Sequence, residues 1–470
     1  MRCIWALWSV LMLLLPIQRM AAQSALRMQN YSHELSEHMV TDIRQDERGF
    51  LWFSTWNGLH RFDGYTFKNY KTYPGEECVM ESNRILEIVI GKSGMIYCRD
   101  HERNLYLFDP IRERFYYLPL EQINNTTSKP SFRLLKTFEN GQTILVSNDR
   151  VVQINEAQLD IEQGRGIRTR WFKQGNHPLG ISKIVEVLQS EEEEICLVGD
   201  RKLFIGEREV AMPEGVQILS ATRYTNRICL LTDHNQLLFI STKSGSMERI
   251  SLPKQVDTPD FVMALDEERI AVATHHGAWL YTPWNRRFMH IDLARCGTPD
   301  THVSNFFVDS RKQLWMHTYG EGVVRYDLQQ GDLQYLQSPK EDIPYASAES
   351  IPFCFEDANG TFWVLPRGGT LGYFDYEEQC LKTYYADPAL PETRFTPTML
   401  LHFLDRQGNL WYTGTSGLYR ITLRPDDIRY RTLDTGYDTR ALMTDRHNRL
   451  WVATKGGYVR IFNADLTLQG

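Results

Sequence analysis

The sequence has little that would attract nucleic acid, chelate zinc or form a disulfide framework. Its 470 residues carry a formal net charge of −7 at pH 7, so we expect no direct nucleic-acid contact. The eight cysteines are scattered, with no CxxC pair and no Cys/His cluster of zinc spacing. We therefore expect no metal site and no cofactor. Most cysteines are predicted to be small buried residues. One disulfide, between Cys78 and Cys98, is kept as an alternative.

Motifs for catalysis are also scarce. No GxSxG elbow and no Walker loop is present, so the common nucleophile and nucleotide signatures are missing. His275 and His276 are adjacent and would point to opposite faces if they lay in a strand, which is poor geometry for one metal ion. We predict no catalytic residue in this chain.

Apolar residues form only one long run, at the start of the chain. The segment from Ile4 to Ile17 is almost wholly apolar, Arg2 precedes it, and the small residues Ala22 and Ser24 follow it. The run is too short for a membrane span of about 20 residues. Residues 1–24 are therefore predicted to be a secretory signal peptide, which places the rest of the chain outside the cytoplasm.

A repeated pattern of Asp, Gly and Trp is the main positive feature. The string "DERGFLWFSTWNGLHRFD", which begins at Asp46 and includes Gly49 and Gly58, returns four times in recognisable form. In every copy the Trp stands six residues after the Asp, in the pairs Asp46 and Trp52, Asp309 and Trp315, Asp357 and Trp363, Asp405 and Trp411, and Asp445 and Trp451. A residue repeated at one place in five units is expected to pack one unit on the next.

Weaker copies of the same unit lie between the first and second of these pairs. With Trp52 as the first marker, the corresponding residues are Tyr97, Leu145, Leu197, Leu230, Val272, Trp315, Trp363, Trp411 and Trp451. Most steps are about 40 to 52 residues, the spacing of propeller blades. Each unit has short β-rich runs separated by turns and almost no helical period. A four-stranded sheet of this size cannot bury both faces alone, so sheets must stack around an axis.

The predicted fold is all-β: a seven-bladed β-propeller followed by the first three blades of a second, incomplete propeller. The first propeller is assigned to residues 25–330, with residues 26–31 closing its last blade, and the second to residues 331–470. Three blades cannot close a ring, so we expect the chain to be the N-terminal part of a longer protein.

The segment "ELSEHMVTDIRQDERGFLWFSTWNGLHRFDGYTFKNY", residues 34–70, resembles the periplasmic sensor region of hybrid two-component system proteins. The resemblance implies two propellers, an immunoglobulin-like domain, one membrane helix, a histidine kinase, a receiver and a DNA-binding domain. It also implies a periplasmic location and an oligosaccharide ligand. The parent protein would lie in the inner membrane and form a homodimer through parts outside this chain. It would control the transcription of glycan-utilisation genes. The parent would be a protein histidine kinase, and this region would be tethered to the membrane only through later segments.

Ligand contacts are expected on one propeller face, formed by the loops that enter a blade and the loops that join its second and third strands. That face would carry Ser36, Glu37, His38, Trp56, Asn57, His302, Asn305, Tyr319 and Glu321. Trp56 and Tyr319 could stack on a sugar ring. For each single position, ordinary local packing is the simpler interpretation.

Two other classes of protein remain open. A secreted propeller glycosidase or lyase would need a cluster of carboxylates and other catalytic groups, which the sequence alone does not bring together. A scaffold that docks another protein is also compatible, because propellers present broad faces. Titration with glycans distinguishes the sensor from the scaffold, and product analysis identifies an enzyme.

Overall fold

The structure, a computed structural model, describes residues 27–35, 39–118, 132–161, 165–173, 179–298, 301–318, 323–336, 353–365, 371–383, 399–414, 417–423, 439–447, 449–463 and 467–469. Within these residues the regular structure is β-strand, apart from two short 3-10 helices, η2 (Glu156–Gln158) and η3 (Leu293–Cys296). The all-β prediction is confirmed. None of the helices in this part of the chain is long and apolar enough to cross a membrane. The chain divides into two compact units, one of which is Met28–Leu423.

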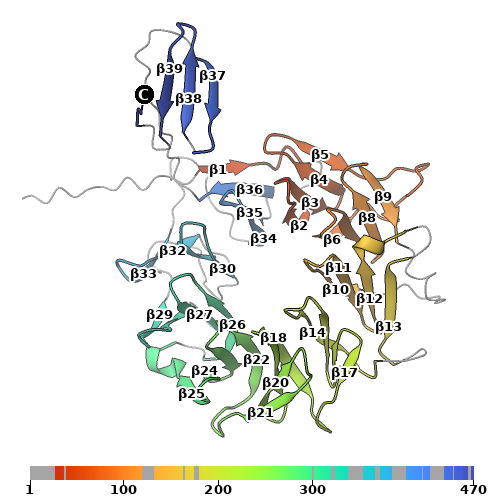
Figure 1. Cartoon of the computed structure of the whole chain (residues 1–470), viewed down its shortest axis with the longest axis vertical. Coiled ribbons are helices and arrows are strands. Elements are labelled where there is room, and N and C mark those ends of the chain that lie inside the picture. The colour runs from red at the N-terminus through yellow and green to blue at the C-terminus, as the bar shows by residue number, and fades with distance from the viewer. Residues whose placement is uncertain are drawn as a thin grey trace, which may run out of the picture. The chain divides into compact units, whose positions relative to one another are not determined.

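Among the described residues of the unit Met28–Leu423, nine four-stranded sheets are present (Figure 1). In chain order, eight of them are β2 (Val40–Gln45), β3 (Leu51–Thr55), β4 (Gly58–Phe62) and β5 (Phe67–Tyr70); β6 (Ile85–Ile90), β7 (Ile96–Asp100), β8 (Leu105–Asp109) and β9 (Arg114–Tyr117); β10 (Phe132–Thr137), β11 (Gln142–Ser147), β12 (Arg150–Asn155) and β13 (Ile167–Trp171); β14 (Ile184–Gln189), β15 (Ile195–Gly199), β16 (Leu203–Ile205) and β17 (Arg208–Val210); β18 (Ile218–Tyr224), β19 (Arg227–Thr232), β20 (Gln236–Ser241) and β21 (Met247–Ser251); β22 (Pro259–Ala264), β23 (Ile270–Thr274), β24 (Gly277–Thr282) and β25 (Arg287–Ile291); β26 (Val303–Val308), β27 (Gln313–Thr318), β28 (Val323–Asp327) and β29 (Leu333–Leu336); β30 (Phe353–Glu356), β31 (Phe362–Leu365), β32 (Gly372–Asp375) and β33 (Cys380–Thr383). The ninth joins β1 (Arg27–Asn30) to β34 (Met399–Leu404), β35 (Asn409–Gly414) and β36 (Gly417–Thr422).

The second unit contains one described sheet of three strands, β37 (Thr439–Thr444), β38 (Leu450–Thr454) and β39 (Val459–Phe462). It repeats the antiparallel pairing of the other sheets. All ten marker residues predicted from the repeat, from Trp52 to Trp451, lie in the second strand of a sheet. Among the described residues, the ten predicted repeat units therefore correspond to ten sheets.

Each sheet is a meander in which consecutive strands pair antiparallel, as Trp52 pairs with Arg44 in β2 and with Arg61 in β4. All five residues of β3 are buried, whereas the outer strand β5 has exposed and half-buried positions. Strands covered on both faces read as continuous apolar runs, which explains the sequence "LWFST". In each of the first seven sheets the first strand has a register irregularity near its start. Such bulges bend a strand and redirect a side chain.

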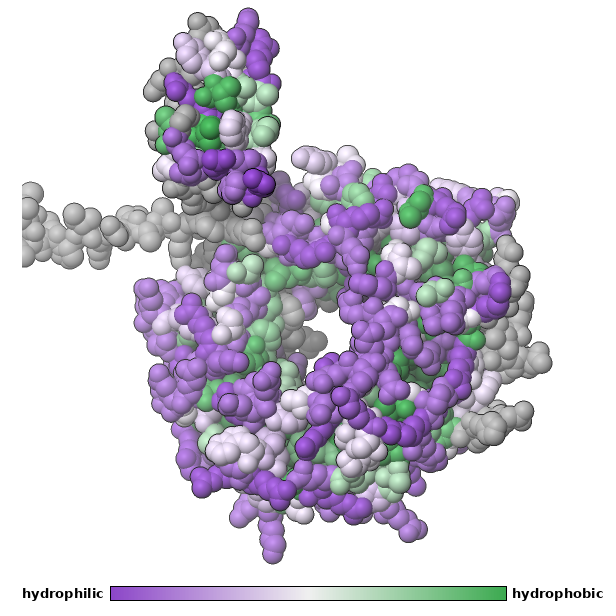
Figure 2. Space-filling model, in the orientation of Figure 1, coloured by the Kyte–Doolittle hydropathy of each residue, from purple (hydrophilic) through white to green (hydrophobic). Residues whose placement is uncertain are grey.

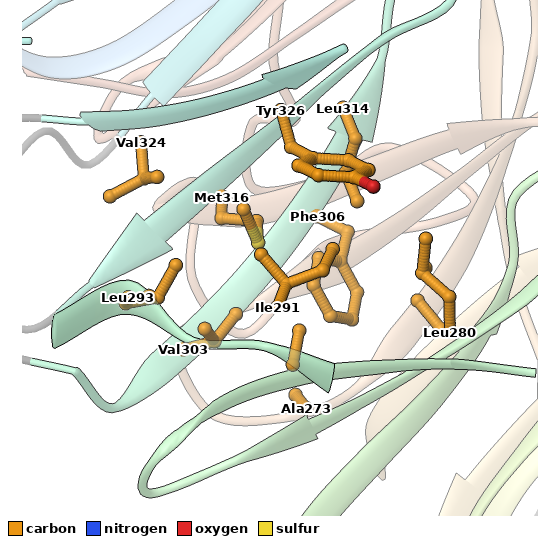
Figure 3. Packing of buried hydrophobic residues seen from close by; sticks show 12 residues of the cluster. Ala273, Leu280, Ile291, Leu293, Val303, Phe306, Leu314, Met316, Val324 and Tyr326 are labelled. Atoms are coloured by element: carbon orange, nitrogen blue, oxygen red, sulfur yellow. The ribbon is translucent and has the colours of Figure 1, made fainter. Parts of the chain in front are cut away.

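Apolar clusters between neighbouring sheets hold the unit together. Figure 3 shows the cluster between the sixth and seventh sheets, where Leu280 and Ile291 face Phe306, Met316 and Tyr326. These side chains are between 0% and 7% exposed. Burying one such side chain contributes about 1.5 to 3 kcal/mol relative to exposure. In Figure 2 hydrophilic residues predominate on the visible face around a central opening, and apolar residues show only in small patches among them.

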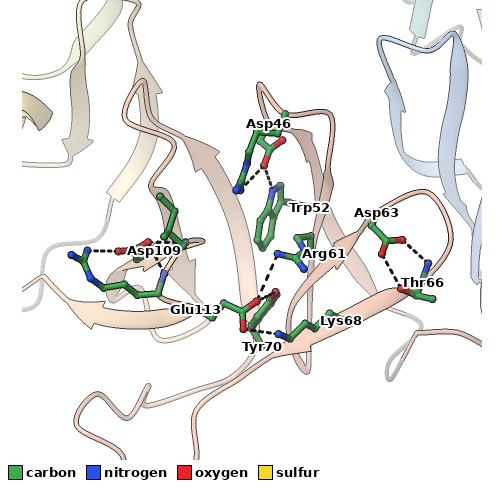
Figure 4. Close-up of polar contacts among 12 residues, drawn as sticks. Asp46, Trp52, Arg61, Asp63, Thr66, Lys68, Tyr70, Asp109 and Glu113 are labelled. Carbon is green, nitrogen blue, oxygen red and sulfur yellow. Dashed lines mark hydrogen bonds and ion pairs between the residues drawn. The ribbon is translucent and has the colours of Figure 1, made fainter. Parts of the chain in front are cut away.

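The repeated Asp and Trp form the same local hydrogen-bonded motif in each copy. Asp46 Oδ2 accepts a hydrogen bond from Trp52 Nε1 at 3.1 Å (Figure 4). Asp46 Oδ1 accepts one from the backbone N–H of Phe50 at 3.0 Å. The other four pairs have the same indole contact, with Nε1 to Oδ2 distances of 2.8 Å at Trp315, 2.9 Å at Trp363, 2.8 Å at Trp411 and 3.0 Å at Trp451. The carboxylate thus closes the hairpin and satisfies the buried indole N–H at once.

The N-terminal strand has a different partner from the one predicted. Residues 26–31 were expected to close the seventh blade, but β29 occupies that edge of the seventh sheet and β1 pairs with β36. The hairpin from β28 to β29 is short and is held by Asp327, whose Oδ1 accepts from the backbone N–H groups of Gln329 and Gln330 at 2.7 and 2.8 Å. Closing a short local hairpin costs less conformational entropy than pairing strands that are far apart in the chain.

The sheets on either side of residue 330 belong to the same compact unit. Tyr31 packs on Trp411 with a 5.3 Å separation of ring centroids, and Phe53 of the first sheet packs on Trp411 at 5.4 Å. The first and ninth sheets are therefore neighbours. The division into two propellers at residue 330 is not shown and stays a prediction.

Candidate ligand-binding face

The turn between β3 and β4 belongs to the face predicted to contact ligand. Thr55 Oγ1 donates to the carbonyl of Gly58 at 3.0 Å and accepts from the backbone N–H of Asn57 at 3.0 Å. Gly58 has φ +105°, and a Cβ there would lie 2.4 Å from the carbonyl oxygen of Tyr70. Only glycine fits such a position without strain. The ends of the turn are thus fixed, and Trp56 and Asn57 are presented between them.

Trp56 is 42% exposed, which is high for a tryptophan in this protein. Its backbone N–H donates to the carbonyl of Met39 at 3.3 Å, and the guanidinium of Arg84 lies 5.1 Å from its ring centroid. A cation over an aromatic ring helps to fix the ring orientation. Beside it, Lys71 Nζ donates to Asn57 Oδ1 at 3.5 Å. An exposed, oriented indole next to amide and ammonium groups can stack on a pyranose ring and bond its hydroxyl groups.

The turn between β23 and β24 repeats this design with different side chains. Thr274 Oγ1 donates to the carbonyl of Gly277 at 2.9 Å and accepts from the backbone N–H of His276 at 3.2 Å. Gly277 has φ +94°, and an added Cβ would lie 2.3 Å from the carbonyl oxygen of Ile291. His275 therefore holds the place of Trp56. The expectation that the two histidines would point to opposite faces applied to a strand, and the structure places them in a turn instead.

His302, a predicted ligand contact, meets His275 and a residue that the sequence analysis missed. His302 Nε2 lies 2.5 Å from Asp260 Oδ2, and His275 Nε2 lies 3.5 Å from the same oxygen. The two imidazole rings stack with centroids 3.9 Å apart. Asp260 comes from β22, where the register irregularity between Pro259 and Phe261 leaves it without a cross-strand partner. The matching turns "TWNG" and "THHG" could have indicated His275, but the sequence gives no signal for Asp260.

The other predicted ligand contacts divide into one with a local role and five outside the described residues. Asn305 Oδ1 accepts from the backbone N–H of Phe306 at 2.8 Å, and Asp42 Oδ1 accepts in the same way from Ile43 at 2.9 Å. Asn305 thus serves the bulge of its strand. The five predicted residues for which the structure gives no description are Ser36, Glu37, His38, Tyr319 and Glu321.

A polar pocket lies at the outer edge of the first two sheets, and its lining residues Asn69 and Lys71 also bond Asn57 of the β3–β4 turn. Glu113 accepts from Lys68 Nζ at 2.5 Å and from the Tyr70 hydroxyl at 2.8 Å, and Arg61 lies 3.7 Å away (Figure 4). The hydrogen bond from Lys68, followed by that from Tyr70, lowers the pKa of Glu113. Tyr73, which is 54% exposed, also lines the pocket. Glu113, Arg112 and Arg114 in this pocket are already paired with Lys68, Asp109 and Glu77, which makes these three charges weaker candidates for ligand capture.

A buried Cys and His pair does not form a nucleophilic site. His317 Nε2 and Cys354 Sγ are 3.0 Å apart. Burial lowers the pKa of His317 to about 4 and raises the pKa of Cys354 to about 12. Both groups are neutral at pH 7, whereas a reactive cysteine is a thiolate. Cys78 and Cys98 are free thiols, so the disulfide left open for them does not form.

Comparison with known proteins gives this architecture a family context. A family model described as "Two component regulator propeller" matches residues 34–57, which cover β2, β3 and the turn at Trp56. Residues 34–57 are a two-component regulator propeller repeat. Over 40 residues the chain is 52% identical to "Histidine kinase P4" of Formosa agariphila, a match over 8% of this chain and 3% of that protein.

Solved structures with a similar fold include extracellular domains of putative two-component systems and an enzyme. The extracellular domain of a putative hybrid two-component system from B. thetaiotaomicron is 15% identical, with 95% of this chain and 66% of that chain covered and a TM-score of 0.39. A streptogramin B lyase is 10% identical, with 85% and 98% covered and a TM-score of 0.39. The chain thus spans about two thirds of the length of the extracellular domain, and the regulator repeat at residues 34–57 is the more specific finding.

Proposed function

We propose that this chain is the periplasmic ligand-sensing region of a hybrid two-component signalling protein, and that its ligand is an oligosaccharide. The observation that carries the proposal is the regulator repeat at residues 34–57, whose β3–β4 turn presents the exposed indole of Trp56. The relative that matches 40 residues of this chain is named a histidine kinase. A kinase, a membrane helix and a dimer contact would belong to the rest of the parent protein.

Sensing requires that the ligand bind two states of the parent protein with different affinity, since equal affinity shifts no equilibrium. A ligand held between turns of neighbouring sheets could favour one packing of the sheets over another. The turns are suited to this, because their ends are fixed by Thr55 and Gly58 while the central side chains remain accessible. The kinase would read this difference across the membrane and change the transcription of genes for using the glycan.

Binding can be tested by calorimetric titration of the purified chain with a panel of oligosaccharides. Trp56→Ala should weaken binding of the active oligosaccharide at least about tenfold, a loss typical of a stacking aromatic contact. Tyr65→Ala is the matched control: Tyr65 is 88% exposed and lies in the β4–β5 turn, at the opposite end of the same sheet. Unchanged affinity in Trp56→Ala, or an equal loss in Tyr65→Ala, would refute the assignment of this face.

The same titration distinguishes the two other classes of protein. Recovery of the oligosaccharide intact after incubation, measured by mass spectrometry, is expected for a sensor. Shortened products that depend on the chain would identify a glycosidase or lyase instead. Failure of all oligosaccharides to bind, together with capture of a protein, would favour the scaffold.

A further inference from the structure

A second group of side chains on this face has the composition of a metal site. Asp260, His275 and His302 each bring one ligand atom, and these atoms all lie within 4.8 Å of one another. Their side chains are 38%, 48% and 25% exposed, so an ion can reach them from solvent. They come from three separate segments: β22, the turn between β23 and β24, and the connection that enters β26.

Backbone contacts hold the three segments together without any ligand. The N–H of Gly277 donates to the carbonyl of Thr301 at 2.8 Å, and Thr301 Oγ1 donates to the carbonyl of His275 at 3.0 Å. These bonds tie the histidine turn to the connection that carries His302. The bulge in β22 directs Asp260 toward both imidazoles, which is the usual consequence of a bulge beside a site.

A second acid adds to the negative charge at this place. Asp257 Oδ2 lies 3.4 Å from His276 Nδ1, on the other central residue of the turn. His290 Nε2 lies 2.9 Å from the carbonyl of His276, and its ring stacks on Trp279 with centroids 4.6 Å apart. The contact to His290 is thus made by the backbone carbonyl of His276, while the His276 imidazole faces Asp257. The two acids, Asp257 and Asp260, favour a cation at this turn.

We propose that Asp260, His275 and His302 bind one divalent transition-metal ion, with Zn²⁺ as the best match. Two imidazole nitrogens and one carboxylate oxygen suit Zn²⁺, whereas Ca²⁺ and Mg²⁺ prefer oxygen ligands alone. Three protein ligands leave a fourth position for water or a bound molecule. The two rings now lie 22° from parallel, so binding requires them to rotate until both lone pairs point at the ion. The exposure of His275 allows this movement.

Titration of the metal-free chain with Zn²⁺ tests the site directly. The full chain is treated with a chelator, dialysed, and titrated with Zn²⁺ in competition with a chromophoric chelator. One equivalent should bind, and His302→Ala, His275→Ala and Asp260→Asn should each lower the affinity at least about tenfold. His276→Ala, in the same turn, is the matched control and should bind like the original chain. Equal loss in His276→Ala, or no loss in the three ligand variants, would overturn the proposal.

Co²⁺ provides a second readout that does not depend on affinity alone. Four-coordinate Co²⁺ absorbs visible light much more strongly than hexaaqua Co²⁺, so the loaded chain should show an intense band that His302→Ala lacks. Circular dichroism of each variant shows whether the sheets remain folded. A folded chain whose Co²⁺ spectrum equals that of the free ion in buffer would refute the site. This inference is independent of the oligosaccharide, because Zn²⁺ and Co²⁺ are the only ligands used.

Discussion

The contact between Trp315 and Phe362 tests whether the seventh and eighth sheets are neighbours. The two rings stack with centroids 3.7 Å apart and planes 11° from parallel, and both side chains are 0% exposed. The predicted boundary at residue 330 would instead put these residues in separate propellers. We consider a double-mutant cycle with Trp315→Leu, Phe362→Leu and the double variant.

The structure allows the magnitude to be worked out. Trp315 also packs edge-on against Phe374 with a 5.1 Å centroid separation, and its Nε1 donates to Asp309 Oδ2 at 2.8 Å. Replacing such a buried tryptophan by a small side chain costs about 3 to 5 kcal/mol, and Leu should cost somewhat less. The aromatic pair itself is expected to add about 0.5 to 1.5 kcal/mol beyond its buried area. That last quantity is the coupling free energy that the cycle measures.

Urea unfolding followed by circular dichroism gives the free energy of unfolding for each chain. A coupling of about 0.5 to 1.5 kcal/mol is expected for Trp315 with Phe362. Trp315 with Tyr97, a buried residue of the second sheet, serves as the distant pair, and its effects should add within about 0.5 kcal/mol. Trp284→Ala, at a position that is 78% exposed, should change stability by less than about 0.5 kcal/mol. Additive effects for Trp315 and Phe362 would refute the adjacency of their sheets.

Two further predictions concern pH and glycine. Burial lowers the pKa of both His60 and His317 to about 4, with Lys71 adding to the effect at His60. Between pH 6.5 and 4 the unfolded chain binds protons that the folded chain does not, so stability should fall by about 1 to 2 kcal/mol per histidine from pH 7 to pH 5. Urea unfolding at both pH values should show a smaller fall in His317→Gln, and an equal fall would contradict the assignment. Gly277→Ala should cost about 2 kcal/mol or more in the same assay. Gly64→Ala is its control, since φ there is +105° but an added Cβ meets nothing within 4 Å; an equal cost would show that strain, and not the clash, dominates.

The repeat made much of the fold predictable from the sequence. In all five strong copies the Trp is the sixth residue after the Asp. In the structure this spacing lets one carboxylate bond both a turn amide and the indole N–H. Because the contact is local, its geometry follows from the sequence spacing. The weaker units were placed correctly for a related reason: residues such as Leu145 and Val272 are fully buried in the same second strand without an indole.

Pairings between distant segments were less predictable. Residues 26–31 resemble the outer strand of a repeat unit. This resemblance predicts that they form an outer strand, but it does not predict which sheet they join. In the structure the Ser32 hydroxyl accepts from the backbone N–H of Leu418 at 3.2 Å, and Tyr31 donates its N–H to the carbonyl of Leu418 at 2.9 Å. No sequence period links residues so far apart. The cluster of Asp260, His275 and His302 was missed for the same reason, since a bulge and two connections bring it together.

The β3–β4 and β23–β24 turns show which positions of the repeat can vary in side chain. In both, the threonine hydroxyl and a glycine with positive φ fix the ends of the turn. The two central residues contribute only backbone groups to this frame, so their side chains can change without loss of the turn. One turn carries Trp56 and Asn57, which suit a sugar, and the other carries His275 and His276, which suit a cation or an acid. Because the hydrogen bonds that define the turn do not involve these side chains, specificity on this face can vary from sheet to sheet while the β-scaffold stays the same.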